Sequence, residues 1–246
     1  MDPAPGAHGA GGLRLDDGMN YRRMERLLPG WLRRHALYFE ARIEEAVKEF
    51  AASLDAGARV LDAGAGEGRY AVQFAKQRYY GVDLGVGDAA WDYRRLDAVA
   101  DLAALPFAAG CFEAAISVVT LEHVREPARV VGEMARTLKP GGRLLLVAPQ
   151  EWEVHQAPHD YYRFTRYGLR SLLEAAGFMD IHVLPVGGYF RLLSRRLLNG
   201  LQFFHGIWLV PAALLLAPPA LALPALDSLD RDRNFTLGYI CKAKMR

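Results

Sequence analysis

The stretch Arg59-Val60-Leu61-Asp62-Ala63-Gly64-Ala65-Gly66-Glu67-Gly68-Arg69 decides the fold. It begins as an apolar strand and breaks into a glycine-rich turn that is expected to open a helix. Glycines at 64, 66 and 68 can take positive φ angles, and they place no side chain between the main chain and a ligand. The sequence therefore predicts a turn that a nucleotide-like molecule can approach closely.

The spacing of these glycines points away from a dinucleotide. The dinucleotide fingerprint G-x-G-x-x-G would need a small residue at position 69, where this chain has Arg69. A pyrophosphate also favours a bare helix N-terminus, whereas Asp62 precedes this turn and Glu67 lies inside it. Two acids favour a ligand with positive charge, such as S-adenosylmethionine. A nicotinamide-dependent oxidoreductase is the alternative, which titration with NADH would test.

Four segments of the chain resemble, in order, the class I S-adenosylmethionine-dependent methyltransferases of the ubiquinone-biosynthesis type. They are VLDAGAGEG at 60–68, YYGVDLG at 79–85, DLAALPFAAGCFEAAISVVTLEHV at 101–124 and RTLKPGGRLLLVAP at 136–149. The resemblance implies an enzyme with an α/β, Rossmann-like fold. Its sheet would have seven mostly parallel strands, with helices on both faces and strand seven antiparallel.

Apolar runs and helix-length segments alternate as that fold requires. Strands are expected at 59–62, 79–83, within 91–101, and at 112–118, 143–148, 181–186 and 235–243; helices are expected at 69–77, 128–138 and 166–176. Residues 1–18 are expected to be a disordered tail, and 19–246 a single methyltransferase domain. The pattern of residues 21–50 predicts amphipathic helices that cover the site as a lid, with a break at Pro29-Gly30. Tyr38, Phe39 and Arg42 in these helices are expected either to line a pocket or to pack in the core.

Acidic residues at predicted strand ends are the main candidates for binding the cofactor. Asp83 lies 21 residues beyond Asp62, where a carboxylate can accept hydrogen bonds from both ribose hydroxyls. By the resemblance, Asp101 accepts from the adenine amino group and the Leu102 N–H meets a ring nitrogen, and a helix N-cap is the structural alternative for Asp101. Asp62 is expected to organise the turn and receive the methionine ammonium, or to be purely structural. Gly64, Ala65, Gly66, Gly68, Leu84 and Thr120 complete the expected cofactor site.

Three histidines are candidate general bases, because an alcohol or phenol must lose its proton during methyl transfer. His123 follows the fourth predicted strand, and His155 and His159 lie in the polar, aromatic loop 150–165. In the same loop, Tyr161 and Tyr162 are expected to wall the acceptor, and Arg163 to clamp an anion. An Asp160–Arg163 ion pair, with Thr165 capping the next helix, is the structural alternative.

Residues 199–226 contain no formal charge over twenty-eight positions. The flanking predicted strands would form one hairpin, so an odd number of membrane crossings is excluded, and two crossings would need about 40 apolar residues. Pro211, Pro218, Pro219 and Pro224 are expected to break the segment into short helices. We therefore expect 189–233 to be an apolar insertion that lies at a membrane surface, with Arg191, Arg195 and Arg196 facing anionic head groups. A cap on the acceptor pocket or a dimer contact is the alternative.

Net charge and cysteine content bear on the partners and the location of the protein. The net charge of +2 without a basic run disfavours nucleic acid. Two cysteines without metal-ligand spacing indicate a reducing compartment and no metal site, so a cytoplasmic protein, peripheral at the inner face of the membrane, is expected. The acceptor is expected to be a small or lipid-linked molecule methylated at oxygen. Carbon or nitrogen methylation of a quinone-type or other metabolite, or a non-catalytic membrane adaptor that keeps the cofactor-binding fold, are the alternatives.

Overall fold

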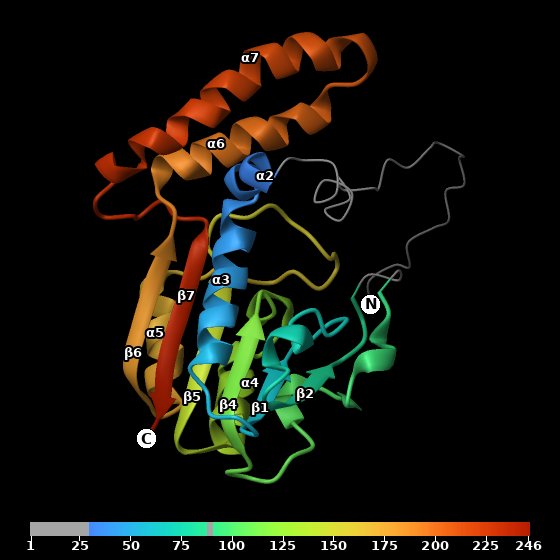
Figure 1. The fold of residues 1–246 in the computed structure, drawn as a ribbon, viewed down its shortest axis with the longest axis vertical. Helices are drawn as coiled ribbons and strands as arrows, with labels where there is room; N and C mark the ends of the chain where they lie inside the picture. Colours follow the sequence, from blue (N-terminus) through green and yellow to red (C-terminus); the bar gives the residue numbers. More distant parts are fainter. Residues whose placement is uncertain (1–29, 88–90) are drawn as a thin grey trace, which may run out of the picture.

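A computed structural model describes residues 30–87 and 91–246, so the expected tail at 1–18 and the helix expected before Pro29 lie outside the described residues. The core of the molecule is one seven-stranded sheet (Figure 1). Its strands are β1 (Arg59–Ala63), β2 (Arg78–Asp83), β3 (Ala98–Val99), β4 (Phe112–Val118), β5 (Leu138–Pro149), β6 (Phe178–Val186) and β7 (Gly238–Met245). Their order is β3-β2-β1-β4-β5-β7-β6, with β7 antiparallel to both of its neighbours. The expected sheet is thereby confirmed.

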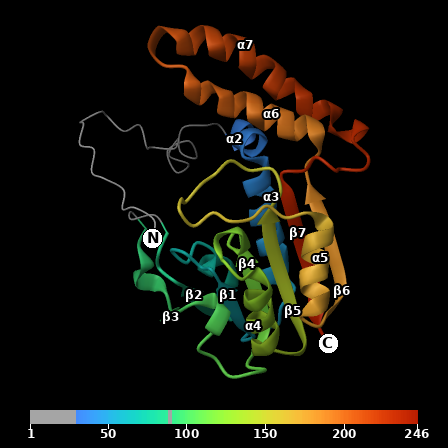
Figure 2. The same ribbon diagram turned by 180° about the vertical axis from the view of Figure 1, so that it is seen from behind.

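Helices cover both faces of this sheet (Figures 1 and 2). One face carries α3 (Tyr38–Ala52), which buries an apolar stripe that includes Phe39, Val47 and Phe50, while the short α2 (Gly30–Ala36) precedes α3 beyond the end of the sheet (Figure 1). The other face carries α4 (Pro127–Thr137) and α5 (Arg166–Ala175), which bury Met134 and Leu169 in a second cluster. Strands buried on both faces explain the continuous apolar runs from which they are recognised in the sequence.

The insertion between β6 and β7 forms a helical hairpin. Its arms are α6 (Tyr189–Gly200) and α7 (Leu209–Ala222), followed by a 3₁₀ segment at Leu223–Leu229. Short 3₁₀ turns at Leu201–Phe203 and Gly206–Trp208 join the arms. The hairpin lies beyond the end of the sheet toward which the β4 and β6 arrows point, with α7 outermost (Figures 1 and 2). It therefore shares the carboxyl end of the parallel strands, where ligands bind in such folds.

Two local predictions are wrong. The helix expected at 69–77 is a turn with a short 3₁₀ segment, Ala71–Phe74, because this stretch buries only Phe74 and a short isolated helix is marginal in water. The lid is interrupted at Leu37, between α2 and α3, whereas the break expected at Pro29-Gly30 falls at the edge of the described residues, which begin at Gly30. Of the four prolines, Pro224 lies where α7 gives way to the 3₁₀ segment, but the other three do not break the insertion. Pro211 lies in the first turn of α7, where its missing N–H has no intrahelical partner, and the helix continues through Pro218 and Pro219.

Candidate active site

The glycine turn after β1 has the backbone that its sequence predicts, with φ of +93° at Gly64, +54° at Gly66 and +72° at Gly68. A Cβ added at Gly64 would lie 2.2 Å from Thr120 Cγ2 and 2.7 Å from Thr120 Cβ. The hydroxyl of Thr120 donates toward the Gly64 and Val118 carbonyls, at 3.3 and 3.2 Å. Only glycine at 64 lets the turn after β1 and the turn after β4 come this close.

Asp83, at the end of β2, fixes the glycine turn through hydrogen bonds from backbone N–H groups. Its Oδ2 accepts from the Gly66 N–H at 3.0 Å, and its Oδ1 accepts from the Gly85 N–H at 2.8 Å. A carboxylate oxygen has two lone pairs, so each can still accept a hydroxyl of a ligand. The structure thus brings Asp83 to the glycine turn. Leu84, the next residue, is exposed, whereas Ala65 inside the turn is buried.

Asp62 is buried at the end of β1, and one of its oxygens has no partner among the described residues. Tyr79 donates its hydroxyl to Asp62 Oδ2 at 2.6 Å, while the buried Oδ1 accepts no hydrogen bond. Burial raises the pKa of Asp62 to about 7, against the lowering effect of the Tyr79 hydrogen bond, and the Asp83 charge raises it further. The glycine-turn amides do not bond to Asp62, since Gly64 and Ala65 donate to the Val82 carbonyl. Its expected role in organising the turn is therefore wrong, and Asp83 has that role instead.

Asp101 begins the 3₁₀ segment Leu102–Ala104 as its N-cap, accepting from the Ala103 N–H at 2.8 Å through Oδ1. This is the structural alternative considered for Asp101, and it engages one of its two oxygens. Leu102 is buried. Asp101 follows β3, which pairs with β2 at Asp83, so both acids lie at neighbouring strand ends.

Trp91 is a residue of this region that the sequence analysis did not single out. Its Cζ3 would lie 3.3 Å from a Cβ at Gly66. The backbone N–H of the next residue, Asp92, donates to Glu67 Oε1 at 3.0 Å, which fastens the segment to the glycine turn. The sequence could have indicated Trp91, because it is an aromatic residue shortly after Asp83, the acid at the end of β2.

The loop 150–165 lies against the end of β4 through the 3₁₀ turn Leu121–His123. Tyr161 and Tyr162 both donate their N–H groups to the Glu122 carbonyl. Val119, between β4 and this turn, has a φ of +53°, which is strained for a β-branched residue. Such strain persists only where surrounding contacts hold it, and it clusters at functional sites.

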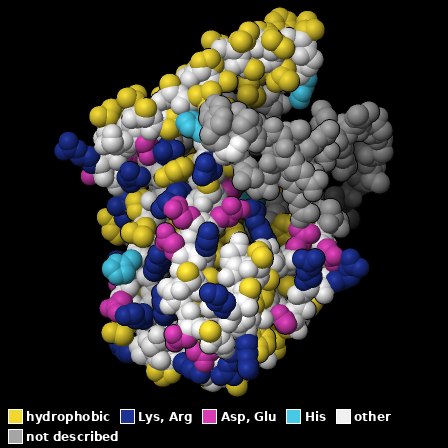
Figure 3. Space-filling model, in the orientation of Figure 1, with side chains coloured by type: hydrophobic (Ala, Val, Ile, Leu, Met, Phe, Trp, Pro, Cys, Tyr) yellow, Lys and Arg dark blue, Asp and Glu magenta, His cyan; other side chains and the backbone are white. Residues whose placement is uncertain are grey.

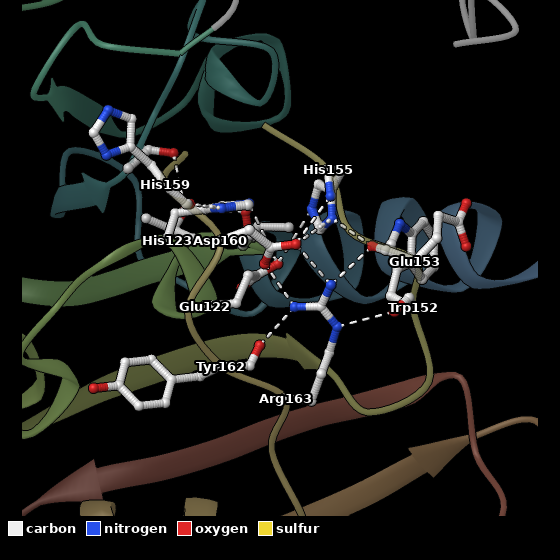
Figure 4. Close-up of polar contacts among 12 residues, drawn as sticks. Glu122, His123, Trp152, Glu153, His155, His159, Asp160, Tyr162 and Arg163 are labelled. Atoms are coloured by element: carbon white, nitrogen blue, oxygen red, sulfur yellow. Dashed lines mark hydrogen bonds and ion pairs between the residues drawn. The ribbon is translucent and has the colours of Figure 1, made fainter. Parts of the chain in front are cut away.

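Glu122 lies at the centre of a buried polar cluster that the sequence analysis missed (Figure 4). It is 0% exposed, and neither carboxylate oxygen has a hydrogen-bond partner among the described residues. Burial raises its pKa to about 8. Its Oε1 lies 3.7 Å from His123 Nε2 and 3.9 Å from His155 Nε2, and the two imidazole rings are 4.7 Å apart. No local pattern signals this, because a Glu after a strand is more often exposed.

The three candidate bases differ in what they face. His123 and His155 turn toward Glu122, and burial lowers the pKa of His123. The His159 ring points away from Glu122 and His155 (Figure 4) and lies with its Nδ1 3.1 Å from the Tyr161 hydroxyl. His159 is therefore the candidate that the cluster leaves available for an acceptor.

Arg163 cannot clamp a substrate anion as expected, because the protein uses all of its donors. It makes a bidentate ion pair with Asp160, at 2.6 and 2.8 Å, and also donates to the carbonyls of Trp152, Glu153 and Tyr162. This pair holds the pKa of Asp160 down at about 2. Thr165 caps α5 by accepting from the Gly168 N–H. The structure thus has the alternative arrangement, in which Asp160 and Arg163 form an ion pair and Thr165 caps the next helix.

The aromatic and lid candidates are placed as follows. Tyr161 is half-buried under Arg125, and Tyr162 is exposed and donates to the Arg125 carbonyl. Phe39 is a core residue that packs on Trp152, Tyr38 lies under Arg191, and Arg42 pairs with Glu45.

Residues 61–146 match the family described as a methyltransferase domain. This part of the chain therefore carries a methyltransferase domain. The ubiquinone biosynthesis O-methyltransferase of Xylella fastidiosa (strain M23) is 33% identical over 166 residues, covering 54% of this chain and 64% of that protein. An S-adenosylmethionine-dependent methyltransferase of Mycolicibacterium smegmatis is 31% identical over 172 residues, covering 63% of each. This methyltransferase-domain chain thus spans just under two thirds of the curated relatives that it matches.

Among solved structures, the domain is similar to phosphoethanolamine N-methyltransferase 2 of Haemonchus contortus in complex with S-adenosylmethionine. The TM-score is 0.54 at 17% identity, covering 83% of this chain and 52% of that one. At this identity the likeness shows the fold alone.

Proposed function

We propose that this chain transfers the methyl group of S-adenosylmethionine to a hydroxyl oxygen of a small or lipid-linked acceptor. The observation that carries the proposal is the buried, unpartnered Asp62 Oδ1 beside the glycine turn. An unpaired buried carboxylate is costly, and an ammonium group of the cofactor would give it a partner. The donor set therefore fits a cationic ligand.

The residues around the turn would bind the rest of the cofactor. Asp83 has lone pairs left to accept from the two ribose hydroxyls, and Asp101 has one oxygen left for the adenine amino group. Gly64 and Gly66 leave room for Thr120 and Trp91 to pack against the turn. Trp91 would cover the nucleoside from the side of Gly66.

The chemistry asks little of the protein beyond alignment. Bound S-adenosylmethionine supplies a methyl group activated by the sulfonium, and the protein must hold the acceptor in line and exclude water. A hydroxyl acceptor must also lose its proton, and His159 is the side chain assigned to receive it. Tyr161, at 3.1 Å from the Nδ1 atom, would orient the imidazole. Ubiquinone biosynthesis O-methyltransferases among the relatives support oxygen over carbon or nitrogen.

We further propose that the acceptor is taken from a lipid surface, to which the α6–α7 hairpin binds. Within the described residues, one helical segment, Gly206–Leu229, is 24 residues long and apolar enough to cross a membrane, and 17% of its most apolar window is buried. Because β6 and β7 pair in one sheet, the chain must return to the side from which it left. The hairpin would therefore lie in the interface and not span the bilayer.

A lipid surface fits α7 better than a second copy of the chain. Leu214 and Leu215 are 73% and 72% exposed, yet they point about 100° apart on a helix with 3.6 residues per turn. Apolar side chains cover the outer helix of the hairpin in Figure 3. A dimer would cover one side of α7, whereas an apolar medium covers every side. The hairpin also contacts the acceptor loop, because Arg196 pairs with Glu153 at 3.0 Å.

The arginines expected to meet anionic head groups are engaged within the protein. Arg191 lies 3.5 Å from Asp227, Arg195 lies 2.9 Å from Glu40, and Arg196 pairs with Glu153. That part of the expectation is wrong, so the proposed contact is apolar. A cytoplasmic, peripheral location stays a prediction.

Calorimetry with S-adenosylmethionine tests the cofactor site. We expect Asp83→Ala to weaken binding at least tenfold, because a charge-assisted hydrogen bond contributes about 1.5–3 kcal/mol. Asp180→Ala, at an exposed position on β6, is the control and should bind as the wild type does. Equal affinity of Asp83→Ala and the wild type would remove the ribose assignment.

Mass spectrometry of a cell extract incubated with deuteromethyl-labelled cofactor tests transfer. A labelled O-methyl product that His159→Gln fails to make supports the proposal. Cofactor binding without any labelled product would favour the adaptor alternative, and label on carbon or nitrogen would overturn the assignment of oxygen.

A further inference from the structure

Glu122, His123 and His155 bring three potential metal ligands together from two segments of the chain. Glu122 and His123 follow β4, and His155 comes from the loop after β5 (Figure 4). One ligand atom of each side chain lies within 4.8 Å of the others. All of these atoms are buried, and none has a hydrogen-bond partner among the residues that the structure describes.

The hydrogen bonds of the two rings fix which nitrogen faces the cluster. His123 Nδ1 lies 2.6 Å from the His159 carbonyl, and His155 Nδ1 lies 3.0 Å from the Glu153 carbonyl. A carbonyl oxygen only accepts, so each Nδ1 carries the proton and each Nε2 presents a lone pair. Metal-binding histidines characteristically donate their other ring N–H to a carbonyl or carboxylate in this way.

Hydrogen bonds within the cluster leave these lone pairs unsatisfied. Both Nε2 atoms lie beyond hydrogen-bond distance of Glu122 Oε1, at 3.7 and 3.9 Å. A protonated Glu122 could donate a hydrogen bond to only one of the two Nε2 atoms, and only after the side chains moved closer. A metal ion would bind all three side chains at once. In a tetrahedral site with bonds of about 2.1 Å the ligand atoms lie about 3.4 Å apart, so the ligand atoms, which lie within 4.8 Å of one another, need to approach by at most about 1.4 Å.

The charge of the cluster also fits a divalent cation. Asp160 lies 3.5 Å from His155 Nδ1, but Arg163 neutralises it through the bidentate pair. Among the residues that the structure describes, Glu122 is then the uncompensated acid that faces the two rings. Two imidazole nitrogens and one carboxylate oxygen suit zinc-like transition metals, whereas magnesium and calcium favour oxygen ligands.

We propose that Glu122, His123 and His155 bind one divalent transition-metal ion of the zinc type. This departs from the expectation of no metal that the cysteine count gave. The ion would fasten the loop 150–165 to the turn after β4, and so would fix the wall of the proposed acceptor site. Metal binding here does not depend on methyl transfer.

The test uses the full chain, treated with a chelator and dialysed, then titrated with Zn²⁺ and with Co²⁺ as a spectroscopic probe. We expect one equivalent of metal by elemental analysis, a visible Co²⁺ absorption band that indicates nitrogen ligation, and a rise in Tm with Zn²⁺. Mg²⁺ at the same concentration should raise Tm little. Glu122→Gln and His155→Gln should each weaken Zn²⁺ binding at least 100-fold, because they remove a ligand directly while keeping side-chain size.

His182→Gln, on the exposed edge strand β6, is the matched control and should bind Zn²⁺ as the wild type does. Circular dichroism of each variant without metal shows that it is folded. Absence of a stoichiometric site in the wild type would overturn the proposal, and so would equal Zn²⁺ affinity in the wild type and a folded Glu122→Gln variant.

Discussion

At the scale of single residues, Asp62 combines a cost in stability with a function in binding. It is 1% exposed, and its one hydrogen bond, from Tyr79, does not compensate for the lost hydration of a carboxylate. The folded protein therefore holds a proton on Asp62 to about pH 7, whereas the unfolded chain releases it near 3.8. Sites that bind ligands commonly keep such locally unfavourable groups.

Asp62→Asn should separate this cost from the function. Between pH 4 and 7 the folded state binds the Asp62 proton more tightly than the unfolded state, so this group's contribution to stability falls as pH rises. At pH 8 the variant should be more stable than the wild type by up to about 4 kcal/mol, since each unit of the pKa difference corresponds to about 1.4 kcal/mol, while its affinity for S-adenosylmethionine falls. Urea denaturation from pH 4 to 8 and calorimetry measure both. A stability difference that does not change with pH would contradict the assigned pKa.

At the scale of elements, the strands were predictable and the geometry of the site was only partly so. Apolar runs such as 112–118 define strands without tertiary information, because a sheet covered on both faces buries nearly all of their residues, here six of seven. The glycines and Asp83 were recognisable because close approach and strand-end carboxylates leave a spacing in the sequence. Glu122 left none. Its burial comes from the loop 150–165, which folds back onto it over thirty residues later.

Arg163 was misjudged because its partners depend on the path of the loop around it and not on a pattern in the sequence. An arginine in a polar loop looks free to bind an anion, but its carbonyl partners are supplied by the fold of residues 152–162 around it. The helix expected at 69–77 failed for a related reason. Its apolar spacing is adequate, but tertiary packing uses only Phe74, and Val72 is 74% exposed.

The Asp160–Arg163 pair should stabilise the acceptor loop. Asp160 has a side chain only 2% exposed and accepts from both Arg163 and the His155 N–H, so Asp160→Asn should lower the free energy of unfolding by about 2–3 kcal/mol at pH 7. Because its folded pKa is depressed to about 2, this stability is present above pH 4 and is lost as pH falls through 2. Urea denaturation measures the change.

Asp180→Asn is the comparison for that experiment. Asp180 pairs with Lys244 at 3.2 Å, but both side chains are more than half exposed, so the loss should be about 0.5 kcal/mol or less. Equal losses in the two variants would show that the Asp160–Arg163 pair does not hold the loop.

At the scale of the whole molecule, the apolar hairpin and the candidate active site share one end of the sheet (Figures 1 and 3). The two are joined by polar contacts, since Arg195 lies 3.9 Å above the Trp152 ring and pairs with Glu40 of α3. A surface that receives α7 would therefore lie beside the acceptor loop. An acceptor with a lipid tail could then present its head group to the loop without leaving the membrane.

Substitution of Leu214 and Leu215 by lysine should abolish binding to phospholipid vesicles. Two charges placed on the outer helix oppose burial in the acyl region, and both positions are exposed, so the fold should remain. Flotation with neutral phosphatidylcholine vesicles measures the loss, and Tyr167→Lys, at a 77% exposed position on α5, is the matched control.

Because Arg191, Arg195 and Arg196 are engaged within the protein, anionic lipid should add little to the affinity. Flotation of the double variant equal to the wild type, or a wild-type dimer in sedimentation that the double substitution dissociates, would instead assign α7 to a soluble or dimeric role.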